Sequence, residues 1–94
     1  MTTLRIEHRI ANYDGWKKAF DSDPINRKQS GVKRFRIYRP VNDDHYVVID
    51  LDFEHLEQAE AVEAALRRMF GNIEGKLVFG ATTTIFNIAE EADL

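Results

Sequence analysis

The chain has 94 residues, a net charge of −3 and no cysteine, which indicates one small domain and excludes disulfides, thiolate metal sites and cysteine nucleophiles. Its 44% apolar and 31% charged residues are ordinary for a soluble globular protein. No run approaches the roughly 18 apolar residues of a membrane span, and the opening Met-Thr-Thr-Leu-Arg lacks an apolar signal core. We therefore expect a single cytoplasmic domain over residues 1–94.

The first predicted element is a strand over residues 3–10, where apolar and polar residues alternate. One face of this strand carries the residues at even positions, which are Leu4, Ile6, His8 and Ile10. A period of two is typical of a strand with one buried face. The alternation therefore places His8 on the buried side.

A helix is predicted next, since Asn12 or Asp14 can cap its first turn. One face of this helix carries aromatic residues at spacings of three and four, namely Tyr13, Trp16 and Phe20. Pro24 interrupts the pattern. We expect a second helical piece over residues 25–30, ended by Gly31 with a positive φ.

The rest of the chain predicts two strands, a helix and a last strand, at residues 32–39, 46–53, 54–70 and 81–88. The helix has an inward stripe of apolar residues, Leu56, Ala59, Val62, Leu66 and Met69 or Phe70. Between this helix and the last strand, four apolar residues are expected to be buried: Ile73, Leu77, Val78 and Phe79. We expect the acidic residues 90–93 to be loosely ordered.

The resulting order is β-α-β-β-α-β. Short connections and right-handed crossovers favour one antiparallel four-stranded sheet with both helices on one face. This is the ferredoxin-like arrangement of the α+β class.

The sheet face away from the helices is predicted to be charged. In the ferredoxin-like order the third strand lies between the first and the second, so Asp50 and Asp52 face arginines on both sides. Such a face can lie bare to solvent or line a salt-bridged interface with a second sheet. The two aspartates could also hold a divalent cation, but the flanking arginines argue against it. The basic and aromatic residues 33–39 could bind nucleic acid, although pairing with carboxylates and the net negative charge disfavour this.

The run from His8 to Asp21, His-Arg-Ile-Ala-Asn-Tyr-Asp-Gly-Trp-Lys-Lys-Ala-Phe-Asp, resembles the opening of small proteins of the dimeric α/β-barrel superfamily. Arg27, Gly31, the strand ending Tyr38-Arg39 and the helix start Leu56-Glu57-Gln58-Ala59 also fit. The similarity covers about residues 4–60 and points to cyclase-like and antibiotic-biosynthesis-monooxygenase-like proteins. It implies a ferredoxin-like subunit that dimerises sheet to sheet, with a ligand cavity between helices and sheet.

Five residues are candidates for this cavity. His8 can transfer a proton near neutral pH, or it can be a core histidine hydrogen-bonded to a neighbour. Trp16 and Phe20 are either cavity wall or core, and the Tyr13 hydroxyl either contacts a ligand or caps the turn. Arg27 can hold an anionic group at the cavity mouth, or pair with a nearby aspartate. The three histidines are too scattered in sequence to predict a metal site.

Two functions remain open from the sequence. The first is a homodimer that binds a small, planar, partly polar organic molecule, with His8 as the proton carrier in cyclisation or in monooxygenation without a cofactor. The second is a non-catalytic ligand-binding or structural dimerisation module, in which the aromatic cluster is core. A cavity of roughly 300 Å³ or more beside His8 favours a ligand site.

Overall fold

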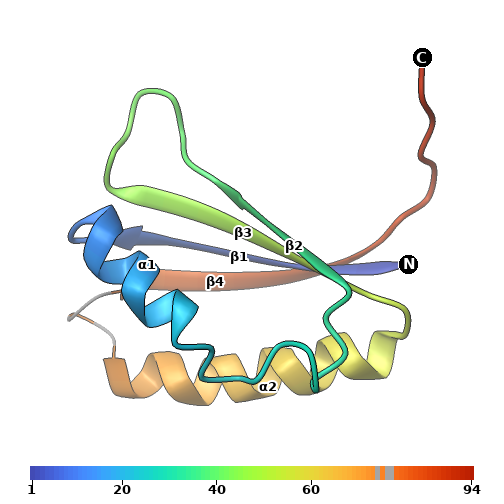
Figure 1. Cartoon of the computed structure of the whole chain (residues 1–94), viewed down its shortest axis with the longest axis horizontal. Helices are drawn as coiled ribbons and strands as arrows, with labels where there is room; N and C mark the ends of the chain where they lie inside the picture. The colour runs from blue at the N-terminus through green and yellow to red at the C-terminus, as the bar shows by residue number, and fades with distance from the viewer. Residues whose placement is uncertain (74, 76–77) are drawn as a thin grey trace.

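The computed structural model describes residues 1–73, 75 and 78–94 (Figure 1). The elements in chain order are β1 (Thr2–Ile10), α1 (Tyr13–Asp21), β2 (Arg34–Tyr38), β3 (Tyr46–Phe53), α2 (Leu56–Ile73) and β4 (Val78–Asn87). The strands form one antiparallel sheet in the order β2-β3-β1-β4. Both helices lie on the same side of this sheet (Figure 1). The predicted ferredoxin-like arrangement is confirmed.

The core lies between the sheet and the helices. In the register of β1 and β3, Leu4 faces Leu51, Ile6 faces Ile49, and His8 faces Val47. All of these side chains are buried, because directly opposite residues in an antiparallel pair share one face of the sheet. The predicted inward position of His8 is confirmed, with 2% of the residue exposed.

The start of α1 follows the prediction, and the segment after it does not. Asn12 is extended and its side chain accepts a hydrogen bond of 2.7 Å from the Gly15 amide, which satisfies one free donor of the first turn. The helix expected at residues 25–30 is absent, and turns take its place. Asp23 and Asn26 adopt positive φ values of 57° and 54°, which a continuous right-handed helix cannot contain.

Helix α2 differs from its prediction at both ends. It begins at Leu56, whose side chain is 44% exposed and does not belong to the inward stripe. Ala59, Val62 and Leu66 are buried as predicted. The helix continues through Gly71, since one glycine costs a helix only about 1 kcal/mol.

Strand β4 begins three residues earlier than predicted, and its register shifts between Glu7 and Arg9 of β1. Gly80, with a φ of 65°, lies at this irregularity, as expected for a bulge. The shift places Phe79 opposite Arg9 on the outer face, where it is 37% exposed. The expected burial of Phe79 is therefore wrong, and that of Val78 is confirmed. Leu77 and the side chain of Ile73 lie outside the described residues.

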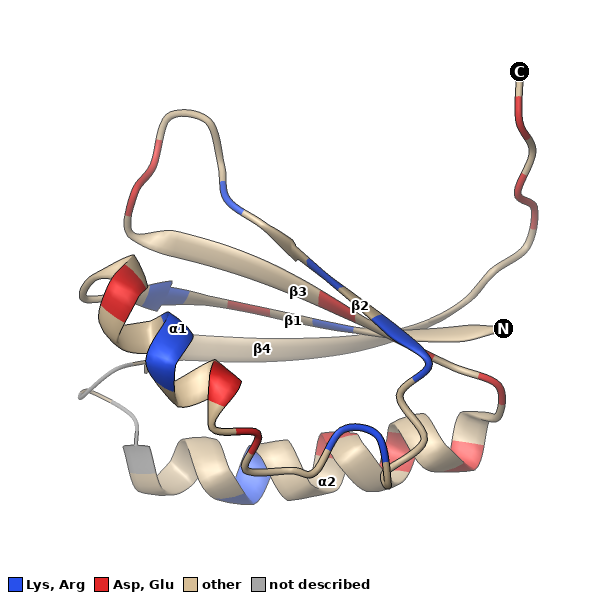
Figure 2. Ribbon diagram, in the orientation of Figure 1, with Lys and Arg blue, Asp and Glu red and all other residues tan. Residues whose placement is uncertain are grey.

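Neighbouring strands of the sheet carry opposite charges (Figure 2), and the predicted ion pairs join them on the outer face. Arg5 forms two hydrogen bonds to Asp50, of 2.8 and 2.9 Å. Asp52 accepts from Arg34 at 3.2 Å and from the Thr3 hydroxyl at 2.7 Å. These bonds join β1, β3 and β2 across the face and occupy both aspartates.

The two edges of the sheet are β2 and β4. The β2 edge is basic, whereas the ten residues of β4 include no charged residue and no proline. In the described part of the chain, neither helix has the length and apolar character needed to cross a membrane.

Asp50→Asn should remove part of the acid sensitivity of folding. The Arg5 guanidinium bonded to Asp50 lowers the pKa of that carboxyl below its ordinary value of 3.8. A carboxyl whose pKa is lower in the folded state stabilises the fold above the unfolded pKa, and this stabilisation is lost as the pH falls through the folded pKa. We expect a loss of about 1 kcal/mol at pH 7, since Arg5 is 38% exposed and solvent weakens the pair.

Chemical denaturation between pH 7 and pH 2.5 measures this effect. The stability of the variant should fall less steeply below pH 4 than that of the parent. Glu60→Gln, at an exposed position on α2, is the matched control and should keep the parental pH dependence. An Asp50→Asn protein with that same dependence would contradict the prediction.

Candidate functional site

A cavity of about 270 Å³ lies between the sheet, α1, α2 and the chain that follows α1. Its walls come from every layer of the fold: Ile6, His8, Trp16, Ala19, Phe20, Ser22, Pro24, Ile25, Arg27, Ile49, Leu51, Leu66, Met69, Phe70 and Val78. The volume is just below the lower end of the range for small-molecule sites, roughly 300 Å³. Four of the five candidate site residues line it, and Tyr13 is the exception.

His8 lies in the sheet side of the cavity, among aromatic rings. The centroids of the Trp16 and Phe70 rings are each 5.9 Å from that of the imidazole, with interplanar angles of 61° and 64°. These are edge-on contacts, the geometry that aromatic pairs favour. The Nδ1 atom lies 3.1 Å from the Arg9 carbonyl oxygen, within hydrogen-bond distance. The Trp16 and Phe70 rings and the Arg9 carbonyl of β1 therefore hold the imidazole ring in place.

Helix α1 supplies the aromatic wall. Trp16 is 5% exposed, and its ring lies 5.3 Å from that of Phe20, one turn later. Phe20 in turn contacts Phe35 of β2 at 5.1 Å. The contacts of Trp16 with His8 of β1 and of Phe20 with Phe35 of β2 show that both rings face the sheet.

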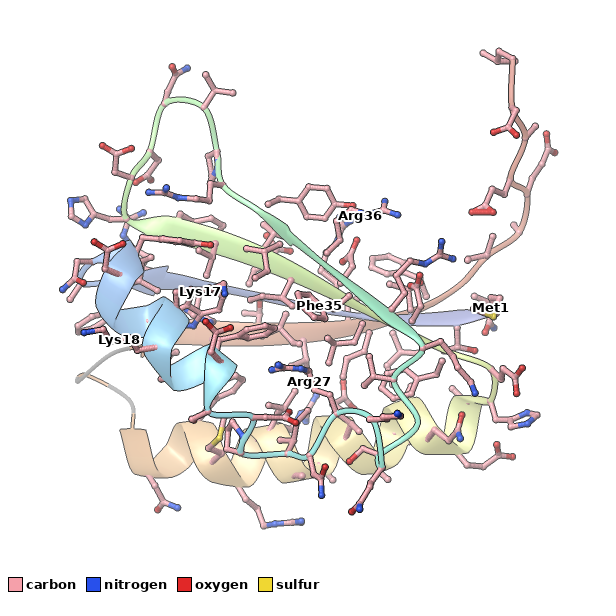
Figure 3. The ribbon with its side chains drawn as sticks, viewed as in Figure 1. Met1, Lys17, Lys18, Arg27, Phe35 and Arg36 are labelled. Carbon is pink, nitrogen blue, oxygen red and sulfur yellow. The ribbon has the colours of Figure 1, made fainter. Side chains whose placement is uncertain are left out.

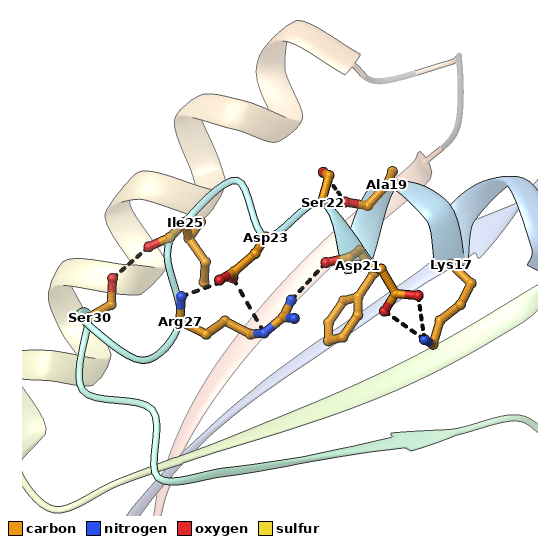
Figure 4. A network of polar contacts seen from close by, with 9 residues as sticks. Lys17, Ala19, Asp21, Ser22, Asp23, Ile25, Arg27 and Ser30 are labelled. Atoms are coloured by element: carbon orange, nitrogen blue, oxygen red, sulfur yellow. Dashed lines mark hydrogen bonds and ion pairs between the residues drawn. The ribbon is translucent and has the colours of Figure 1, made fainter.

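The chain from Ser22 to Arg27 forms a wall of which sequence reasoning identified only Arg27. It has no periodic pattern, and Pro24 is its one local signal. Figure 4 shows how Arg27 holds it. The Arg27 amide donates to the Asp23 carboxylate at 2.9 Å, and its guanidinium lies 3.4 Å from the same carboxylate.

The Arg27 guanidinium also contacts α1. It donates to the Phe20 carbonyl at 2.8 Å and lies 4.0 Å from the centroid of the Phe20 ring. Figure 3 shows Arg27 on the helix side of the sheet, together with Phe35. Arg27 thus pairs with Asp23 and lines the cavity at the same time.

Tyr13 lies on the far side of Trp16 from the cavity. Its ring is 5.8 Å from that of Trp16, and the Arg39 guanidinium covers it at 4.1 Å. The helical spacing correctly groups Tyr13 with Trp16. It does not show that Tyr13, in the first turn of α1, is three residues too early to reach the cavity.

The lining determines what the cavity can hold. Its polar side chains are His8, Ser22 and Arg27, and the remaining walls are aliphatic or aromatic. Among the described residues, no three or more His, Cys, Asp or Glu side chains come together as metal ligands. The arrangement suits a flat apolar molecule with one or two polar groups.

Trp16→Ala should lower the free energy of unfolding by about 3–5 kcal/mol, since it deletes a large side chain that is almost fully buried. Trp16→Phe should cost clearly less, because most of the aromatic contact with His8 and Phe20 is kept. Urea denaturation followed by circular dichroism measures both. A loss below about 1 kcal/mol for Trp16→Ala would show that the ring is only a cavity wall.

Comparisons with known proteins were made on sequence and on structure. No family model matches the sequence, and no curated protein matches it. The structure is similar to that of SnoaB, a cofactor-independent oxygenase from Streptomyces nogalater, with a TM-score of 0.71 and 13% identity over 96% of this chain and 94% of that chain.

Two further structures give the same result. A mutant of MhuD with two manganese protoporphyrin IX molecules bound per active site has a TM-score of 0.70 and 17% identity over 99% of both chains. A dimeric ferredoxin-like protein from an uncultured marine organism has a TM-score of 0.64 and 18% identity over 97% of both chains. Likeness at these identities establishes the fold alone, and the ferredoxin-like fold that the resemblance implied is confirmed.

Proposed function

We propose that this protein is a homodimer that binds a small, planar, partly polar organic molecule in the cavity beside His8, and that it converts this molecule by monooxygenation without a cofactor or by cyclisation. The observation that carries the proposal is the cavity itself. A buried imidazole opens into a largely apolar space lined by three aromatic rings. The cofactor-independent oxygenase among the similar structures supports the same chemistry.

The size of the cavity restricts the ligand. A buried apolar cavity of roughly 150 Å³ holds benzene, so about 270 Å³ suits a molecule of one or two fused rings. A phenol or quinone of this size would lie against Trp16 and Phe20, with its polar group toward His8. A larger ligand would require the wall at residues 22–27 to move.

His8 is the proposed proton carrier. If Nδ1 donates its hydrogen to the Arg9 carbonyl, Nε2 carries the lone pair of the neutral ring and can accept a proton. Removing a proton from a phenol-like substrate gives an electron-rich anion. In monooxygenation this anion supplies the electrons and dioxygen is the oxidant: one oxygen atom forms a new C–O bond, and the other leaves as water with two hydrogens lost from the substrate, so that a CH₂ group becomes a carbonyl. In cyclisation the anion attacks a carbonyl carbon of its own molecule, the C=O π bond breaks, and the resulting alkoxide takes the proton back from His8.

The outer face of the sheet supports a homodimer. Three large side chains on it are more than a third exposed: Tyr38, Phe79 and Phe86. They lie among ion pairs that already neutralise most of the charge of the face. An aromatic surface of this kind marks a protein interface, and the dimeric ferredoxin-like protein from the marine organism supports pairing between identical subunits.

A non-catalytic ligand-binding module is the second candidate. The observation that favours it is the small number of polar side chains in the cavity, which leaves His8 as the one evident acid or base. Arg27 is bound to Asp23 and to the Phe20 carbonyl. Binding without turnover would favour this alternative.

Ligand binding can be tested by fluorescence, since Trp16 is the single tryptophan and lines the cavity. We expect one- and two-ring phenols and quinones to quench its emission in a saturable manner. Leu66→Phe should fill the cavity and weaken binding at least tenfold. Val62→Ile, one turn earlier on the same buried stripe and not among the lining residues, should bind like the parent. No saturable quenching with any of these compounds would contradict the proposal.

His8→Gln should lower the turnover of a bound substrate by about 10²–10⁴-fold, the usual contribution of a general base. Its affinity for the ligand should change little, because the side chain remains polar and similar in size. His45→Gln is the matched control. His45 also places Nδ1 near a backbone carbonyl, that of Ala11 at 3.0 Å, but it is exposed and outside the cavity. An undiminished rate in His8→Gln would remove His8 from the mechanism.

A further inference from the structure

Arg36 differs from the other arginines of the outer face. Arg5, Arg9 and Arg34 each lie within 3.2 Å of a carboxylate oxygen. Within the described residues, Arg36 makes one side-chain hydrogen bond, of 3.3 Å, to the Tyr38 hydroxyl, and no carboxylate lies within ion-pair distance of it. Figure 3 shows its side chain on the side of β2 away from the helices.

The C-terminal residues 88–94, here termed the arm, carry carboxylates that form no ion pair with any cation in the described part of the chain. The last backbone bond of the sheet joins the Ile88 amide to the Met1 carbonyl at 3.1 Å. After Ile88 the chain leaves the sheet on the side opposite the helices (Figure 1), and acidic residues follow one another along it (Figure 2). Glu90, Glu91 and Asp93 are exposed and form no hydrogen bond or ion pair with the described residues.

The base of the arm lies close to the basic strand. Glu91 lines a polar cleft of about 130 Å³ together with Arg34 and Arg36. Glu91 nevertheless stays beyond 4.0 Å from both guanidinium groups, because the arm points away from its own sheet (Figure 1). The backbone of the arm therefore extends toward the space that a facing subunit would occupy (Figure 1).

Covering the outer face with a second copy would take the Arg36 charge out of water. Such a charge is costly to bury unless a carboxylate accompanies it. The arm has the length to provide one: seven extended residues span about 23 Å, whereas two sheets packed face to face lie about 10 Å apart. An arm that leaves one sheet can thus pass alongside the other.

We propose that the arm crosses to the second subunit and that its glutamates pair with Arg36 of the partner subunit. This inference rests on the proposed homodimer and adds a contact between an acidic arm and a basic strand, made twice by symmetry. The contact supplies a carboxylate to Arg36, whose neighbouring acids Asp50 and Asp52 are already ion-paired with Arg5 and Arg34. It also makes dimer stability sensitive to salt.

Three variants test the proposal by sedimentation at low ionic strength. Arg36→Glu, and the arm variant Glu90→Lys with Glu91→Lys, should each raise the dimer dissociation constant at least about tenfold. Lys28→Glu makes the same charge change as Arg36→Glu, but in the turns after α1, and should leave the dimer dissociation constant unchanged. The positions involved are exposed, and circular dichroism verifies that each variant is folded.

Mixing the two dimerisation variants identifies which subunit the arm contacts. If the arm crosses over, a heterodimer of Arg36→Glu with the arm variant restores both contacts, so the mixture should dimerise like the parent. If the arm pairs within its own subunit, mixing restores neither contact. In that case, only a single chain that carries Arg36→Glu, Glu90→Lys and Glu91→Lys together should dimerise like the parent. The second result would overturn the proposal.

Two further outcomes separate this inference from the homodimer itself. A parent protein that stays monomeric at all concentrations would contradict the proposed homodimer. A parent dimer whose dissociation constant is unchanged in both dimerisation variants would overturn the arm contact and leave the homodimer standing.

Discussion

The register of β1 against β3 is the constraint on which the rest of the structure depends. It places Leu4, Ile6 and His8 under the helices and the intervening charged residues on the outer face. A shift of one residue would exchange the two faces completely. The imidazole would then reach solvent and Arg5 would enter the core, so neither the cavity nor the ion pairs could form. The bidentate bond between Arg5 and Asp50 helps to hold this register.

The cavity exists because α1 is short and the chain after it is irregular. A longer helix at this position would cover the sheet with a regular row of side chains. Instead, α1 ends at Asp21, and the backbone turns through left-handed conformations at Asp23 and Asn26. Asp and Asn adopt such conformations more readily than other residues with a side chain, and the Arg27 bonds to Asp23 and to the Phe20 carbonyl hold the segment in place. The same contacts that form the wall thus also keep it closed over His8.

The sequence allowed the regular parts of this arrangement to be predicted. Alternation in residues 3–10 placed His8 inward, and the ferredoxin-like strand order placed Asp50 and Asp52 between arginines, as observed. These predictions succeeded because strand periodicity and short connections are local properties. The spacing of Trp16 and Phe20 likewise predicted one helix face, and both residues line the cavity.

The parts that could not be predicted depend on single departures from regularity. A bulge near Gly80 moves Phe79 to the outer face, and nothing in the local sequence distinguishes this glycine from one in a loop. The wall at residues 22–27 has no period, and its shape depends on φ angles that Asp and Asn adopt only in context. Tyr13 was grouped with the cavity because helical spacing shows which residues share a face but not how far along the helix the cavity extends.

Strand β4 also affects how the chain behaves before it has folded. It forms one border of the sheet, and from Val78 to Asn87 it carries neither charge nor proline. Open backbone groups along such a border can template the addition of a strand from another molecule. Newly made chains would therefore be most prone to aggregate through this strand.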